Sequence, residues 1–236
     1  MMASRGFTFK QFHINHDQCA MKVGTDGILL GAWAPLGQAR RILDVGTGSG
    51  LVALMLAQRG GAGVHITGIE LDARAAAQAR DNVAASPWPD RVEIVTGDLQ
   101  SYQAPRFELI VSNPPYFSHG QAFDCAARAG ARHTGSLDFP ALFRHCNRLL
   151  TEDGRLSLIL PYQALDDACD QAEVNGLHLI EKQNVITRDG KPPGRFLLQL
   201  SRVKGYLIEG CLVINSAYGG YGETYTNMVS PFYLKM

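Results

Sequence analysis

The tetrapeptide Asn113-Pro114-Pro115-Tyr116 contains the residues whose types and spacing are best suited to chemistry. Proline fixes φ and has no N–H, so two prolines in succession make a rigid corner that is not helical. The side-chain oxygen of Asn113 and the carbonyl of Pro114 could accept both N–H groups of a planar amine and localise its lone pair. The ring of Tyr116 offers a face for stacking. An isolated corner of this kind is more often a structural turn with a buried asparagine. Whether this corner is catalytic therefore depends on the motifs around it.

A glycine-rich turn, Asp44-Val45-Gly46-Thr47-Gly48-Ser49-Gly50, follows one expected strand and opens an expected helix. Glycines permit a tight turn and let a ligand approach the backbone. The spacing departs from the dinucleotide fingerprint, because that pattern wants a glycine at position 51, where this chain has Leu51. An ordinary strand-to-helix turn is the competing interpretation.

Two acids follow the next two expected strands. Glu70 comes about 20 residues after the turn, where a carboxylate can accept from both hydroxyls of a ribose. Asp98 follows the third strand, where it can accept from the adenine amine of a cofactor. Each acid alone is more often a surface residue or a helix cap. Open α/β sheets bind ligands at the carboxyl ends of their strands, so the turn and the two acids together predict a cofactor site.

The elements that must position these residues are short apolar strands alternating with amphipathic helices from Arg41 onward. This alternation is typical of a parallel sheet covered by helices. We expect strands at 41–45, 64–69, 91–96, 107–112 and 154–160. We expect helices at 51–59, 72–85 with Asp72 as its cap, 137–150 and 163–174. Strands at 177–187 and 195–203, joined by a turn-rich link, should pair antiparallel.

The 236 residues suit one large α/β domain, 1–236. Within it, we expect an N-terminal cap at 1–40, a catalytic core at 41–204 and an extension of the sheet at 205–236. The cap should hold a short strand or hairpin at 7–13, a turn at 24–27 and a helix at 28–34. In the extension, strand-like pieces flank a turn at 215–222. Residues 117–135 are predicted to form a long loop beside the site that could act as a lid.

The formal net charge is zero, so a nucleic-acid partner would require a local basic face. One candidate run comprises Lys182, Arg188, Lys191, Arg195, Arg202 and Lys204. A second cluster comprises Arg5, Lys10, His13, His16 and Lys22, and Arg128 and Arg132 lie in the predicted loop. Any one of these residues could equally be a solvated surface charge.

The five cysteines contain no Cys-x-x-Cys pair, which argues against a zinc cluster and a disulfide framework. The N-terminus has no signal-peptide pattern, and no apolar run approaches the ~20 residues that span a membrane. We therefore expect a cytoplasmic protein without a bound metal. Nothing in the sequence indicates an obligate protein partner.

The glycine turn with its two acids resembles the class I S-adenosylmethionine-dependent methyltransferases. The resemblance implies a Rossmann-like, mostly parallel seven-stranded sheet with an antiparallel last strand. It also implies that Glu70 holds the ribose of S-adenosylmethionine, that Asp98 reads its adenine and that Asn113 borders the bound cofactor. The residues implied for the methionine part are Asp44, Gly46, Gly48 and Gly50.

The tetrapeptide, in turn, resembles the motif of amino-group methyltransferases that act on adenine N6, cytosine N4, guanine N2 or the amide of glutamine. In that motif, Asn113, Pro114, Pro115 and Tyr116 would be the catalytic residues. All four substrates are planar conjugated nitrogens, so the motif specifies the chemistry well and the substrate poorly.

Three further segments narrow the substrate: Phe9 to Ile14, Met21 to Trp33 and Phe232 to Met236. They resemble a bacterial family of tRNA (adenine-N6)-methyltransferases that act at position 37 of tRNA1(Val). This resemblance extends over nearly the whole chain and is weakest at Gly205 to Gly222. It implies methylation of the adenine next to the anticodon, with the anticodon arm held by local basic patches. It further implies cofactor contacts from Lys22, Thr25 and Asp26.

Alternatives from the same chemistry are a guanine-N2 RNA methyltransferase and a protein-glutamine N5-methyltransferase. A more remote alternative is a non-catalytic RNA-binding protein on the same scaffold. Such a protein would be expected to have lost Asn113 or the glycine turn, and this chain keeps both.

Overall fold

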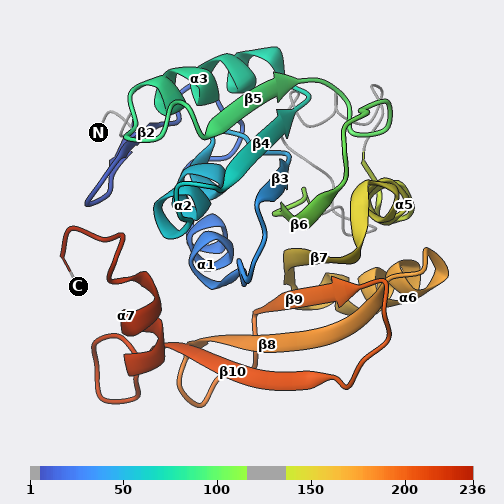
Figure 1. Cartoon of the computed structure of the whole chain (residues 1–236). Helices are drawn as coiled ribbons and strands as arrows, with labels where there is room; N and C mark the ends of the chain where they lie inside the picture. The colour runs from blue at the N-terminus through green and yellow to red at the C-terminus, as the bar shows by residue number, and fades with distance from the viewer. Residues whose placement is uncertain (1–5, 116–136, 236) are drawn as a thin grey trace.

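The computed structural model describes residues 6–115 and 137–235. Its centre is an eight-stranded sheet in the order β10-β8-β9-β7-β6-β3-β4-β5 (Figure 1). The strands are β3 (Arg41–Val45), β4 (His65–Glu70), β5 (Val92–Thr96), β6 (Phe107–Ser112), β7 (Leu150–Pro161), β8 (His178–Arg188), β9 (Arg195–Ser201) and β10 (Ile208–Asn215). Neighbouring strands run parallel except at β9, which is antiparallel to both β7 and β8.

This arrangement confirms the Rossmann-like α/β fold and its antiparallel strand. The sequence predicted seven strands, whereas the sheet has eight because β10 adds to the edge of β8. The antiparallel strand therefore lies inside the sheet, between two strands that precede it in the chain.

Helices cover both faces of the sheet. They are α1 (Thr25–Trp33), α2 (Leu51–Arg59), α3 (Ala73–Ala84), α5 (Phe139–Leu149), α6 (Leu165–Val174) and α7 (Glu223–Val229), with a short 3-10 turn η1 (Tyr162–Ala164). One face packs against α1, α2, α3 and α7, and the other against α5 and α6 (Figure 1). Ile42 and Leu43 are adjacent on β3 but belong to the two different cores. Successive strand side chains point to opposite faces, so a sheet covered on both sides needs continuous apolar runs.

The N-terminal segment begins with a hairpin of β1 (Gly6–Thr8) and β2 (His13–Asn15), as predicted. Phe7 and Phe9 pack against Tyr233 near the C-terminus. The amide of Lys10 donates to the carbonyl of Phe232 at 2.8 Å. The hairpin therefore joins the beginning of the chain to its end. No helix in the described residues is long and apolar enough to cross a membrane.

The prediction of a turn at 24–27 was wrong, because Thr25 to Gly27 form the first turn of α1. A Cβ on Gly27 would lie 3.0 Å from Leu51, and one on Gly31 would lie 2.7 Å from the sulfur of Met55. The two glycines are four residues apart and therefore face α2 together. These glycines therefore allow α1 and α2 to pack closely; they do not form a turn.

The expectation of further strand-like structure after residue 222 was also wrong. There the chain forms α7, in which Tyr225 and Val229 lie one turn apart and are buried. Helical spacing of these side chains against the core outweighs the strand propensity of Thr, Tyr and Val in this segment.

Candidate active site

The carboxyl ends of three central strands lie at one level of the sheet. Val45 of β3 pairs with Ile69 of β4 and with Ser112 of β6. The hydroxyl of Ser112 donates to the carbonyl of Val45 at 2.9 Å and ties two of these ends together. The residues that follow Val45, Ile69 and Ser112 are Gly46, Glu70 and Asn113. Since adjacent strands are about 5 Å apart, these three residues start from neighbouring points along one edge.

The glycine turn is open toward solvent on its inner side. Gly46 and Gly48 have φ angles of 69° and 55°, which side chains other than glycine rarely adopt. Apart from the glycine itself and its two neighbours in the chain, no described heavy atom lies within 4 Å of a Cβ built on either residue. A ligand could therefore approach the backbone here without displacing a side chain. Gly50 also has a positive φ, and it is the N-cap residue that directly precedes α2.

The buried side chain of Asp44 stabilises this turn through hydrogen bonds. Its side chain is 2% exposed, and Oδ2 accepts from the hydroxyl of Thr47 at 2.6 Å and from the amide of Ala53 at 3.2 Å. Burial raises the pKa of Asp44 to about 7, and the negative charge of Glu70 adds to the rise while the two hydrogen bonds oppose it. Asp44 thus links the turn to α2, and its contacts in this structure are internal.

Glu70 lies against the same turn. Its Oε2 accepts from the amide of Gly48 at 2.8 Å, and its Oε1 accepts from the amide of Asp72 at 3.0 Å. A carboxylate oxygen can accept more than one hydrogen bond, so each keeps capacity for a ribose hydroxyl. Asp72 caps α3 as predicted, accepting from the amides of Arg74 and Ala75. The cap and the acid together fix the start of α3 beside the glycine turn.

Asp98 lies at the same edge, one strand further out. Glu70 pairs with Thr96 of β5, and Asp98 follows two residues later. It is partly exposed, and Oδ1 accepts from the amide of Gln100 at 2.9 Å. Its position fits the adenine end of a cofactor whose ribose is held at Glu70.

The corner after β6 combines a partly buried Asn113, a buried Pro114 and an exposed Pro115. Tyr116 lies outside the described residues. So do the predicted loop at 117–135 and its two arginines, Arg128 and Arg132.

The start of α1 adjoins the start of α2, because Gly27 contacts Leu51 and Gly31 contacts Met55 in the same order. Lys22 and Thr25 are exposed at this end. Asp26 instead forms an ion pair with Arg195, with Nε and Oδ2 2.9 Å apart. Arg195 begins β9, so this ion pair joins the N-terminal cap to the antiparallel strand.

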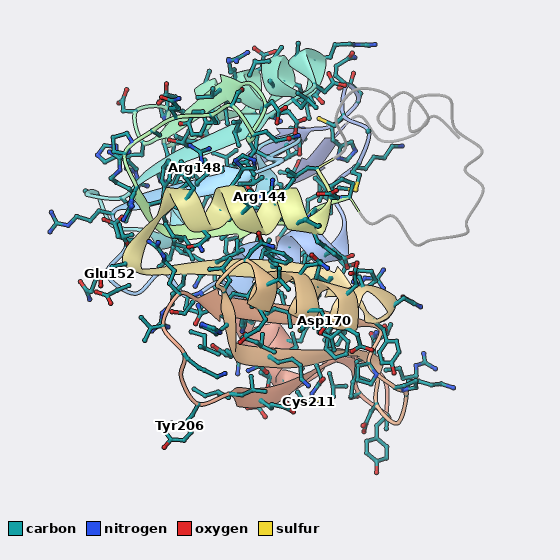
Figure 2. All side chains as sticks on the ribbon, turned by 90° about the vertical axis from the view of Figure 1, so that its right-hand side faces the viewer. Arg144, Arg148, Glu152, Asp170, Tyr206 and Cys211 are labelled. Atoms are coloured by element: carbon teal, nitrogen blue, oxygen red, sulfur yellow. The ribbon has the colours of Figure 1, made fainter. Side chains whose placement is uncertain are left out.

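Strand direction separates the predicted basic run into two groups. Arg188 and Lys191 are exposed at the carboxyl edge, where β8 ends. Arg202 and Lys204 follow the end of β9 and therefore lie at the opposite edge, because β9 is antiparallel. Figure 2 shows Glu152 and Tyr206, which belong to that opposite edge, projecting at one end of the molecule. Only the first group shares an edge with Asn113.

The remaining basic candidates have varied environments. Lys182 pairs with Glu209 in mid-strand, at 3.0 Å. His16 is only 5% exposed, so its assignment to a basic surface was wrong. Its Nδ1 accepts from the amide of Val23 at 3.1 Å, which explains the burial. Lys10 donates to the carbonyl of Ser230, and the ring of His13 bonds Thr8 within the hairpin. Arg5 lies outside the described residues.

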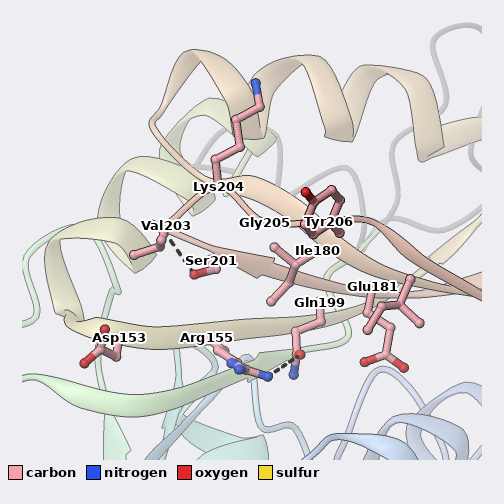
Figure 3. Close-up of a pocket in the computed structure, with 11 residues that line it drawn as sticks. Asp153, Arg155, Ile180, Glu181, Gln199, Ser201, Val203, Lys204, Gly205 and Tyr206 are labelled. Atoms are coloured by element: carbon pink, nitrogen blue, oxygen red, sulfur yellow. Dashed lines mark hydrogen bonds between the residues drawn. The ribbon is translucent and has the colours of Figure 1, made fainter.

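A hollow of about 360 Å³ lies away from this edge (Figure 3). It is lined by the first halves of β7 and β8, the second half of β9, the link at 203–206 and the first residue of β10. Arg155 donates to the side chain of Gln199 across it, at 3.0 Å. These residues lie toward the amino ends of the parallel strands, so the hollow is separate from the glycine turn. In the part of the chain that the structure describes, no cluster of His, Cys, Asp and Glu is suited to a metal ion.

Sequence reasoning missed three polar residues of α3 that contact the N-terminal segment: Arg74, Gln78 and Asn82. Their spacing of four residues in an alanine-rich helix was a readable signal of one shared face. Their partners lie some 60 residues earlier in the chain, which no local pattern reveals.

Comparison with known proteins places this site in a class. The family model of the methyltransferase small domain matches residues 23–166, which include the glycine turn, Glu70 and Asn113. A predicted O-methyltransferase from Agrobacterium tumefaciens superposes with a TM-score of 0.67 at 21% identity, over 88% of this chain and 96% of that one. The chain is thus a methyltransferase of the Rossmann-like class.

Full-length relatives define the family more narrowly. The tRNA1(Val) (adenine(37)-N6)-methyltransferase of Aeromonas hydrophila is 54% identical over 100% of both chains. The protein of the same name from Tolumonas auensis is 46% identical over 100% of this chain and 99% of its own. The chain belongs to the tRNA1(Val) (adenine(37)-N6)-methyltransferase family.

Proposed function

We propose that this protein transfers a methyl group from S-adenosylmethionine to N6 of the adenine at position 37 of tRNA1(Val). One observation carries the proposal: Gly46 and Asn113 follow directly on Val45 and Ser112, which are paired in adjacent strands. A ligand cradled by the glycine turn and a planar amine held at the Asn-Pro-Pro corner would therefore be neighbours.

The residues present fit S-adenosylmethionine. Gly46 and Gly48 leave open space in front of the turn. Glu70 and Asp98 follow neighbouring strands, so Glu70 would bind the ribose and Asp98 the adenine that lies beyond it. Asp44 holds the turn in shape, and the exposed Lys22 and Thr25 border the same end of α2. The bound cofactor would supply a methyl group that its sulfonium already activates.

The protein's part in the chemistry is to prepare the acceptor. The lone pair of an exocyclic amine is delocalised into its ring, so the amine is a poor nucleophile. Oδ1 of Asn113 and the carbonyl of Pro114 would accept its two N–H groups and draw the nitrogen toward a tetrahedral geometry. Fixed φ at both prolines holds these acceptors rigidly, so catalysis rests on positioning and electrostatics. Tyr116 would stack on the base, and the surplus proton would leave to water.

The substrate is inferred from the relatives, since the corner alone accepts any planar amine. Both named relatives match over the full length, and each name specifies adenine N6 at position 37 of tRNA1(Val). The adenine must be unpaired or flipped to reach the corner, which a loop of RNA allows. Arg188 and Lys191 at the same edge would hold the anticodon arm. Such a protein would act in the cytoplasm, where transfer RNA is found.

The test is incubation with total tRNA and isotopically labelled S-adenosylmethionine, followed by mapping of the labelled nucleoside. We expect label at N6 of adenine 37 in tRNA1(Val). Transcripts with guanine at position 37 should stay unlabelled, and label in guanine N2 or in protein would support the corresponding alternative.

Replacement of the acceptor residue is the sharper test of mechanism. Asn113→Ala should lose at least about 2.7 kcal/mol of transition-state stabilisation, roughly a hundred-fold in turnover, as for the loss of one preorganised polar group. Affinity for S-adenosylhomocysteine, measured by calorimetry, should stay within a few-fold. A variant that methylates at the normal rate would show that the corner has no chemical role.

A further inference from the structure

Polar side chains on one face of α3 hold part of the N-terminal segment against that helix. We call residues 15–23 the strap. Arg74, Gln78 and Asn82 are four residues apart, so they form one row along the helix. Each of the three makes a side-chain hydrogen bond to the first part of the strap. The strap therefore lies along α3, from its last turn back toward its first.

Asn82 connects the strap to the glycine turn itself. It is 2% exposed and accepts from the amide of Asn15 at 2.9 Å. Its Nδ2 donates to the carbonyl of Asn15 and to the carbonyl of Ser49, both at 2.8 Å. Ser49 belongs to the turn that would cradle the cofactor. One buried amide therefore binds two backbone segments that are distant in sequence, and loss of that amide would leave several buried polar groups unpaired.

Gln78 holds the next part of the strap and uses both ends of its amide. Its Oε1 accepts from the amide of Gln18 at 3.0 Å and from the thiol of Cys19 at 3.3 Å. Its Nε2 donates to Oδ1 of Asp17 at 2.6 Å. Only a side chain with a donor and an acceptor can make this set, so glutamate at the same position could not.

Hydrogen bonds connect the strap to the predicted ribose acid, Glu70. Arg74 donates to the side chain of Gln18 at 2.6 Å, and Asp72, which accepts from the amide of Arg74, donates its own amide to Glu70. Burial of the half-buried Cys19, together with the nearby negative charges of Glu70, Asp72 and Asp17, raises the pKa of its thiol to about 11. The thiol therefore stays protonated and able to donate. Beyond Cys19 the strap folds back, since Val23 donates to the ring of the buried His16. It then enters α1 at Thr25, next to the glycine turn.

We propose that Asn82 and Gln78 are positioning residues that hold the strap closed over the adenosine side of the cofactor site. This inference rests on the proposed function, because it requires a nucleoside cofactor at Glu70. The strap must open for exchange of that cofactor, and the row on α3 sets how readily it does so. Neither residue touches the reacting atoms, so their effect is on cofactor retention.

The test uses the full-length protein and Gln78→Glu, which keeps the acceptor but places a second carboxylate against Asp17. Asn82→Leu removes the link to Ser49, and Asp81→Asn is the matched control on the exposed side of α3. Calorimetry measures the Kd for S-adenosylhomocysteine. Independently, mass spectrometry measures how fast a maleimide labels Cys19 in the absence of cofactor, with the labelling of Cys211 as the internal reference.

We expect Gln78→Glu to raise the Kd and the labelling rate of Cys19 by at least about ten-fold each. In turnover assays its effect should fall on KM for S-adenosylmethionine and not on kcat. Asn82→Leu should do the same if it folds, which its melting curve shows, and Asp81→Asn should match the wild type.

The outcomes separate the two proposals. Wild-type protein that binds no S-adenosylhomocysteine would overturn the proposed function and this inference with it. Wild-type binding with an unchanged Kd and unchanged Cys19 labelling in Gln78→Glu would overturn this inference alone.

Discussion

Asp44 is the residue at which burial and charge conflict most directly. Burial raises its pKa to about 7 from the ordinary value of 3.8, so the folded protein holds a proton there that the unfolded chain has lost. Between about pH 4 and pH 7 the native state binds more protons than the unfolded state. The contribution of Asp44 to stability is therefore full at low pH and is lost as the pH rises toward 7.

We predict that Asp44→Asn removes this dependence. From pH 5 to pH 8, the unfolding free energy of the wild type should fall by on the order of 2 kcal/mol relative to the variant. Denaturant melts at several pH values measure the difference. A difference between the two proteins that stays constant with pH would show that Asp44 is ionised throughout.

At the residue scale, the sequence was sufficient to predict the positions of residues that directly follow a strand. Gly46, Glu70 and Asn113 each follow an apolar run, so their common edge could be predicted from the alternation of elements alone. His16 could not be placed this way. Its burial depends on the strap folding back on itself, and no periodic pattern in residues 13–23 encodes that contact.

At the element scale, the packing of α1 on α2 gives a prediction in which two effects compete. Gly31→Ala gains about 1 kcal/mol of helix propensity. Its new Cβ, however, would lie 2.7 Å from Sδ and 2.9 Å from Cβ of Met55, and overpacking of this kind costs about 1–3 kcal/mol. We expect a net loss of stability, by about 1 kcal/mol, in denaturant melts.

The background Met55→Ala provides the control, because it removes most of the side chain that the new methyl meets. There only the 2.9 Å approach to Cβ of residue 55 remains, so Gly31→Ala should cost less stability than it does in the wild type, although Met55→Ala itself costs about 2–5 kcal/mol. Equal effects of Gly31→Ala in both backgrounds would mean that the two helices do not constrain each other at this contact.

The same contact explains why the turn at 24–27 was predicted wrongly. Gly-Thr-Asp-Gly has turn composition, and the reason for its second glycine lies on another helix, 24 residues later at Leu51. Near the C-terminus, local composition misled the prediction in another way. Residues 223–229 have strand-like composition, yet they form a helix because helical spacing buries Tyr225 and Val229 on the same face.

At the scale of the whole molecule, a neutral chain must bind an anionic partner by distributing its charges unevenly. The basic run 182–204 is continuous in sequence, but β9 reverses direction and divides it between opposite edges. Arg188 and Lys191 share the edge of Asn113, and the fully exposed Tyr218 lies there too, beyond the end of β10. The amide of Asp189 donates to the carbonyl of Asn215 and holds these two segments together.

We therefore predict that Arg188→Ala combined with Lys191→Ala weakens tRNA binding several-fold at low salt. If each side chain neutralises one phosphate, the slope of log K against log salt should become shallower by about 1.8. Affinity for S-adenosylhomocysteine should not change. Filter binding or fluorescence titration at several salt concentrations measures both the affinity and the slope.

Arg202→Ala combined with Lys204→Ala is the matched control, with the same change in net charge at the other edge. An electrostatic effect of total charge would weaken tRNA binding equally in both double variants. If the docked RNA reaches from Asn113 across the end of β8, only the double variant of Arg188 and Lys191 should bind tRNA more weakly. The comparison therefore distinguishes a local binding edge from a general attraction. The sequence alone could not do so, because the two pairs belong to one basic run in the chain.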